Sequence, residues 1–148
     1  MNGYDTGVIT AAVTRAFPRV DETLGPISSV SRPVWATEVC VRLQRLARLR
    51  ANWDDRGSAA PNTDAITFAF SVLHRVLPPN APAPDIHPLG HGGLQLSWAR
   101  NDLELDLEVI APNNLLVCLS ENGGPEQEWT ATNELSRLES AMWRHFKG

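Results

Sequence analysis

The stretch LQLSWARNDLELDLEVI, residues 94–110, decides the fold. Apolar residues occupy every second position on both sides of the turn ARND, and polar or small residues fill the positions between them. A period of two is typical of β-strands that bury one face. Two such strands joined by a short turn predict an antiparallel meander, in which consecutive strands pair.

The rest of the chain supplies further strands and several helices. A third strand is predicted at residues 115–120, after the turn APNN, and Glu128–Ala131 fits a short edge strand. Apolar residues at helical spacing predict helices at about 34–50, 63–77 and 132–146. Because the strands run together, we expect an α+β fold: a small antiparallel sheet of three to four strands, covered on one face by two to four helices.

Residues 1–33 differ in character from the remainder of the chain, and we predict an arm or short helix with a linker there, before a single α+β domain at 34–148. Pro18 ends a short apolar stripe, and a run rich in serine, glycine and proline comes next. The stripe consists of Val8, Ile9, Ala12, Val13, Ala16 and Phe17. Two interpretations stay open: a first helix or loose tail on the core, or an arm that docks on a partner.

Composition restricts the class of protein. The chain has 148 residues and a net charge of −4, which argues against nucleic-acid binding by the molecule as a whole. Cys40 and Cys118 lack the CxxC spacing of a zinc site, so we expect two reduced core thiols in a cytoplasmic protein. No basic segment opens the chain and no apolar run is long enough for a membrane span, so we expect neither a signal peptide nor a membrane anchor.

Acidic residues fill the outward positions of the second predicted strand. Asp102, Glu104, Asp106 and Glu108 alternate with apolar residues, so we expect them on one sheet face, roughly 7 Å apart along the strand. A solvated outer face is the simplest explanation. The functional interpretation is docking of a basic partner, and a carboxylate metal site is a third possibility that needs ligands from a second element.

Charge is also segregated along the sequence. Residues 101–136 hold eight acids and no base, whereas residues 32–56 hold six arginines and three acids. Such asymmetry can be satisfied within the fold, or it can steer a charged partner. The cluster Arg42–Arg56 leaves phosphate binding as a second alternative function.

Catalytic motifs are sparse in this sequence. His87 and His91 are four residues apart beside Asp85, but proline and glycine between and after them forbid the helix that would make a metal pair. A loop that brings the two rings together would give the alternative of a small metal-dependent hydrolase or nuclease. The chain contains no GxSxG, GxxxxGK[ST] or HExxH motif, so we predict no catalytic residue and no cofactor.

The loop NWDDRGSAAPN, residues 52–62, is predicted to be a structural connection between two helices. We expect Trp53 to pack against both helices, and Asp54 to accept backbone N–H groups or to pair with an arginine. Gly57 suits a left-handed turn, and Pro61 precedes the capping residue of the next helix.

Together with GHGGLQLSW, residues 90–98, this loop resembles a family of small bacterial proteins with no assigned activity. The family combines a Trp-Asp-x-x-Gly…Pro loop with a Gly-Gly-x-x-x-x-Trp strand, and Asp55 departs from its usual glycine. The matching residues are Trp53, Asp54, Gly57, Pro61, Gly92, Gly93 and Trp98, within roughly residues 35–119. The resemblance implies an accessory protein of a mobile, defence or toxin–antitoxin-like gene cluster.

These observations predict a non-enzymatic protein-interaction module. We expect it to bind a protein partner in a bacterial stress, defence or toxin–antitoxin-like system. The expected contact surfaces are the acidic strand, residues 102–108, and the apolar stripe of the N-terminal arm, residues 8–17.

Overall fold

The computed structural model describes residues 32–100, 102–132 and 134–146, which form three helices and five strands. The expected N-terminal stripe, in residues 8–17, lies outside the described residues. The elements, in chain order, are α3 (Ala36–Ala47), α4 (Thr63–Val76), β1 (Asp85–Pro88), β2 (Leu94–Arg100), β3 (Leu103–Ala111), β4 (Asn114–Glu121), β5 (Gln127–Ala131) and α5 (Ser136–Phe146).

The five strands form one antiparallel sheet in the order β1-β2-β3-β4-β5, so the predicted α+β meander is confirmed. The sheet is larger than the predicted three to four strands. The extra strand is β1, whose four residues pair with Leu94–Ser97 of β2. Its sequence, DIHP, is too short to show a period, which is why sequence patterning did not predict it firmly.

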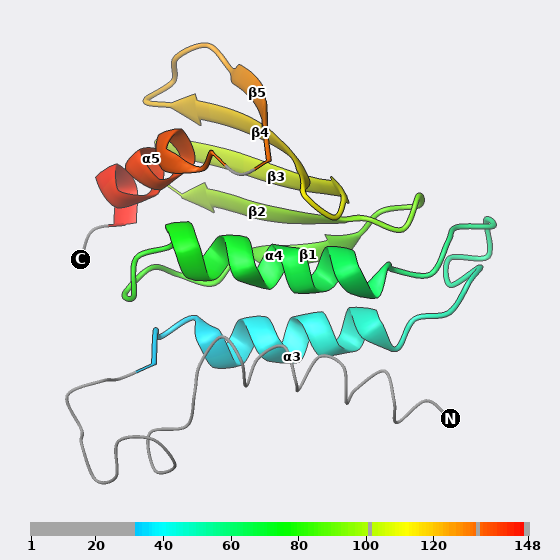
Figure 1. The fold of residues 1–148 in the computed structure, drawn as a ribbon. Helices are drawn as coiled ribbons and strands as arrows, with labels where there is room; N and C mark the ends of the chain where they lie inside the picture. The colour runs from blue at the N-terminus through cyan, green and yellow to red at the C-terminus, as the bar shows by residue number, and fades with distance from the viewer. Residues whose placement is uncertain (1–31, 101, 133, 147–148) are drawn as a thin grey trace, which may run out of the picture.

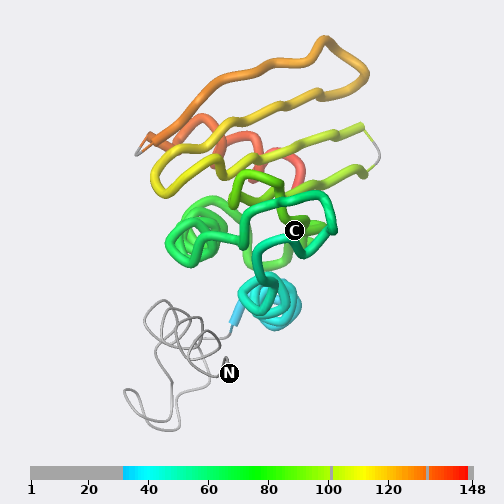
Figure 2. The backbone as a smooth tube through the Cα atoms, turned by 90° about the vertical axis from the view of Figure 1, so that its right-hand side faces the viewer, coloured from blue at the N-terminus to red at the C-terminus, as the bar shows by residue number. Residues whose placement is uncertain are grey.

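The sheet buries one face only. Leucine and valine at alternate positions of β2, β3 and β4 are almost completely buried, and the residues between them are half-buried or exposed. The helices α4 and α5 lie on the buried face, and α3 packs against α4 and beside the β1 edge (Figures 1 and 2). No helix of the described residues lies over the other face, which we call the outer face (Figure 2).

The three predicted helices are present, and α4 begins at the predicted residue, whereas α3 begins two residues and α5 four residues later than predicted. Asn62 caps α4, since its side-chain oxygen accepts hydrogen bonds from the backbone N–H groups of Asp64 at 2.8 Å and Ala65 at 3.0 Å. On α3, Arg42 falls among the apolar positions of the helical stripe. Its guanidinium group binds Glu38 one turn earlier and the carbonyl oxygen of Pro84 before β1. Arg42 thereby ties α3 to the β1 end of the sheet.

The loop at residues 52–62 connects α3 to α4, and Trp53 is not among the partly buried apolar side chains that pack against the core. It is half-buried, and its indole N–H donates to the carbonyl oxygen of Ala59 within the same loop, at 3.0 Å. Asp54 accepts from Ser58 Oγ and from the backbone N–H groups of Arg56 and Ser58, and these bonds hold its pKa below the usual value. Asp54 therefore pairs with the turn and not with an arginine side chain.

The same loop is joined to the turn before β2. Backbone N–H groups of Ala59 and Asn62 donate to the carbonyl oxygens of Gly90 and Gly92, both at 2.8 Å. Gly57 has a φ of 82° and Gly92 a φ of 99°, as expected for left-handed turns. Gly93 does not have a positive φ, but an added Cβ would overlap the carbonyl oxygen of Val109 on β3, so only glycine fits there.

Trp35 and Trp53 make a matched pair for a stability test. Trp35 is 1% exposed, its ring meets Phe70 edge-on, and its indole N–H donates to the carbonyl oxygen of Pro78 at 3.1 Å. We expect Trp35→Ala to lower the free energy of unfolding by about 3–5 kcal/mol, as for large core truncations. Trp53→Ala removes one loop hydrogen bond and should cost about 1 kcal/mol. Chemical denaturation measures the free energy of unfolding of both variants. Equal losses would contradict the different burial of the two tryptophans.

Substitutions of Gly93 and Gly123 compare the stability cost of a crowded Cβ with that of a positive φ. Gly93→Ala places a methyl group against the Val109 carbonyl, and we expect a loss of roughly 3 kcal/mol of stability because strand pairing must shift. Gly123 has a φ of 71° and open space around its added Cβ, so Gly123→Ala should cost about 1 kcal/mol. Thermal or urea unfolding measures both values, and equal losses would contradict the crowding at Gly93.

Candidate functional site

The acidic strand contributes three of its four acids to the outer face. Glu104, Asp106 and Glu108 occupy the outward positions of β3. Asp102 was expected in the same row, but β3 begins at Leu103 and Asp102 lies in the preceding turn, where its carbonyl oxygen accepts from the Asn122 backbone N–H at 2.7 Å. The predicted turn ARND ends at Asp102 and β3 begins after it, so the row of acids on the strand is one residue shorter.

Asp106 is held differently from its two neighbours. Its carboxylate accepts hydrogen bonds from Ser97 Oγ at 2.7 Å and from the side-chain amide of Gln95 at 3.1 Å, both on β2. Sheet register places Ser97 directly opposite Asp106. Asp106 is therefore committed to the sheet, whereas the carboxylates of Glu104 and Glu108 remain available for contacts with another molecule.

The cross-strand neighbours of these acids carry no positive charge. On β2 the residues opposite are Ala99, Ser97 and Gln95, and on β4 they are Ser120, Cys118 and Leu116. A cation opposite an acid would stabilise the sheet, and like charges close together weaken it modestly. The outward positions of β2 to β5 hold no arginine or lysine at all, so within the described strands this face is purely acidic in its charge.

A second acidic group stands where β4 meets β5. Cys118 was expected in the core, but its position between buried Val117 and Leu119 turns its side chain to the outer face. Its thiol donates to Glu128 at 3.5 Å. Burial, then the hydrogen bond and charge of Glu128, and then Glu126 raise the pKa of Cys118 to about 11. The thiol therefore stays protonated at neutral pH and is a poor nucleophile.

Cys118, Glu126 and Glu128 are also the described residues that could hold a metal ion. Their donor atoms lie within 4.8 Å of one another, although both carboxylates are exposed. An ion bound there would have to displace the thiol proton, since thiolate is the ligand form. Sequence reasoning missed this group because Glu126 lies in a loop, where no periodicity indicates its direction.

The structure places the two histidines of the alternative metal site in different surroundings. His87 lies on β1 with its side chain exposed, and His91 lies in the following turn, where its ring Nδ1 accepts from the Gly93 backbone N–H at 3.2 Å. Among the described residues, neither histidine belongs to a group of three or more possible ligands. The hydrolase alternative therefore gains no support from the geometry.

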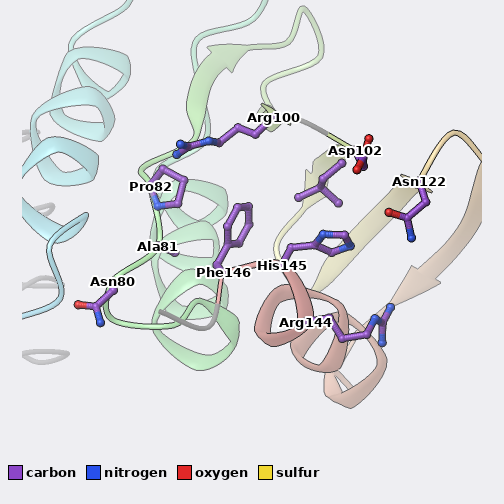
Figure 3. Close-up of a pocket in the computed structure, with 10 residues that line it drawn as sticks. Asn80, Ala81, Pro82, Arg100, Asp102, Asn122, Arg144, His145 and Phe146 are labelled. Carbon is purple, nitrogen blue, oxygen red and sulfur yellow. The ribbon is translucent and has the colours of Figure 1, made fainter.

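A polar hollow of about 430 Å³ lies at the end of the sheet where α5 ends (Figure 3). Phe146, Leu103 and Pro82 contribute its apolar lining. The guanidinium groups of Arg100 and Arg144 point in opposite directions, so they do not converge on one ligand (Figure 3). This arrangement argues against a small anion site.

Glu121, beside that hollow, binds two side chains of α5. It binds His145 Nε2 at 2.6 Å and Arg144 Nη2 at 3.0 Å. Burial raises its pKa, but the hydrogen bonds from His145 and Arg144 outweigh that effect and hold the pKa of Glu121 below its usual value. The group joins β4 to α5, and its role is structural.

The arginine cluster gives little support for phosphate binding. Arg42 is already bound to Glu38 and Pro84, so it is not available to a phosphate. Arg45 lies on α3, Arg50 just after its end and Arg56 in the following loop, and all three are exposed. Neither of the described pockets lies between them.

Comparison with known proteins adds no relative: no protein-family model, curated protein or solved structure matches the chain. The resemblance to the small bacterial family stays a prediction. Among the described residues, no helix combines the length and apolar character needed to cross a bilayer.

The Cys118 thiol gives a pH-dependent test of the acidic group. In a Cys40→Ser background, we expect the rate of alkylation by iodoacetamide to keep rising up to about pH 11, since thiolate is the reactive form. Glu126→Gln with Glu128→Gln removes two charges that raise the pKa. The rate at pH 8 should then rise roughly tenfold for each unit by which the pKa falls.

Glu104→Gln is the control for this test, because Glu104 pairs with Ser120 and not with Cys118. It should leave the alkylation rate unchanged. A rate that levels off near pH 9 in the parent protein would contradict the described surroundings of the thiol.

Proposed function

We propose that this chain is a non-enzymatic protein-interaction module whose outer sheet face binds a basic partner. One observation carries the proposal: an uncovered sheet face with three acids on β3 and no cation at any outward position of the described strands β2 to β5. Charge of one sign on a flat surface speeds and orients encounter with the opposite charge.

The arrangement is better explained by binding than by folding. Folding requires the inner leucines and valines to be buried, but it does not require acids at three successive outward positions. Glu108 and Asp106 are half-buried among Gln95, Ser97 and Leu116, so the surface mixes charge with polar and apolar area, as protein interfaces do.

The setting rests on the sequence alone: on its two cysteines and on its resemblance to the small bacterial family. We place the protein in the bacterial cytoplasm, as an accessory or regulatory member of a stress, defence or toxin–antitoxin-like system. The proposal includes a protein partner that is encoded nearby.

Neutralising the outer face should weaken partner binding. The parent protein, immobilised and exposed to a lysate of its source, should retain one stoichiometric protein, which is then purified and re-tested alone. For Glu104→Gln with Glu108→Gln we expect the affinity to fall about tenfold, because two rim charges are lost, and the loss to shrink at high salt.

A matched control removes two acids elsewhere. Asp55→Asn with Asp64→Asn changes net charge equally but alters a loop and a helix start, away from the outer face. This variant should keep the parent affinity. Equal loss in both variants would mean unspecific charge attraction, and a parent protein that binds no partner would overturn the proposal.

A further inference from the structure

The two edges of the sheet differ in what lies beside them. At the β1 edge, α3 packs alongside, and Arg42 binds the carbonyl oxygen of Pro84 just before the strand. Pro88 ends β1 and has no N–H to donate. These features close the β1 edge against another strand.

The β5 edge is open. Gln127–Ala131 pairs with β4 on one side, and no described element lies on its other side (Figures 1 and 2). The described residues contain no backbone hydrogen bond from β5 to a turn or loop. In an antiparallel strand, alternate residues direct both N–H and C=O to the same side, so β5 presents a row of unpaired backbone groups.

The side chains beside the β5 edge differ between the two faces of the sheet, and we call the two rows the borders of the edge. On the outer face, Glu128 stands beside Glu126, and both are exposed. On the inner face, Trp129 is half-buried, and the Arg137 guanidinium lies 3.7 Å from the centre of its ring. Gln127 holds Arg137 in place by a hydrogen bond of 2.9 Å. The edge therefore combines an acidic border with an aromatic one.

We propose that β5 binds an extended segment of a protein partner as a sixth strand, with basic residues alternating with apolar ones. Basic side chains would face Glu126 and Glu128, and apolar side chains would lie beside Trp129. Main-chain hydrogen bonds supply affinity in such strand addition, and alternate side chains supply specificity. The inference rests on the proposed function and names where and how the basic partner binds.

A second copy of this chain does not fit the edge. Two antiparallel β5 strands paired about Gln127 or Glu128 would bring glutamates of the two copies opposite one another, and like charges at cross-strand positions are unfavourable. Charged residues on an edge strand are a common protection against self-association. The complementary partner is therefore basic.

Synthetic peptides test this mode of binding without changing the protein. The first alternates arginine with valine, the second has the same composition in two blocks, and the third alternates glutamate with valine. We expect only the first to bind well, as measured by fluorescence anisotropy, and to slow hydrogen exchange of the β5 backbone amides. Two further peptides carry N-methyl groups at the odd or at the even positions. One of them should lose binding and the other should keep it, because only one set of N–H groups faces β5.

Protein variants test the acidic border. Glu126→Gln with Glu128→Gln should weaken the alternating peptide about fivefold to tenfold at low salt, and Asp55→Asn with Asp64→Asn should not. Equal binding of the block peptide, without protection of β5, would overturn strand addition while the outer face remained the docking surface. Failure of every basic peptide at low salt would overturn both proposals. Concentration-dependent dimers with protected β5 amides would overturn the basic partner and assign the edge to a second copy.

Discussion

The structure depends on burial of one face of a single antiparallel sheet. Inward residues of β2, β3 and β4, such as Leu96, Leu107 and Val117, are shielded completely from solvent by α4 and α5. Full burial of one such side chain stabilises a fold by roughly 1.5–3 kcal/mol. Because the side-chain period of a strand is two, burying these residues fixes every intervening residue on the outer face. A register slip by one residue would bury the acids instead.

The loops serve the same constraint. Residues 52–62 join α3 to α4 and also bond to the turn of Gly90–Gly93, which starts β2. Gly93 lets that turn approach the Val109 carbonyl closely enough for β2 and β3 to pair. The loop that first suggests a site by its tryptophan and paired acids is thus satisfied within itself, with Asp54 and Asn52 accepting backbone N–H groups.

Sequence alone predicts the elements of this fold in which apolar residues recur at a regular spacing. The alternation at 94–110 predicted β2 and β3, and helical spacing located α3, α4 and α5 to within a few residues, since burial enforces both periods. It did not predict that β1 pairs as a full strand, since four residues show no period. It overextended the row of acids to Asp102, because the place where a turn closes depends on backbone hydrogen bonds rather than on periodicity.

Contacts across elements were the least predictable, and charge shows this best. On the helical side, arginines meet acids of the sheet: Arg42 of α3 lies 3.9 Å from Asp85 of β1, and Arg144 of α5 binds Glu121 of β4. On the outer face, Glu104 and Glu108 form no ion pair within the described residues. A fold able to pair its arginines could also have placed one opposite these acids on β2 or β4. A basic strand from a partner would supply the missing positive charge and would pair with the open β5 edge.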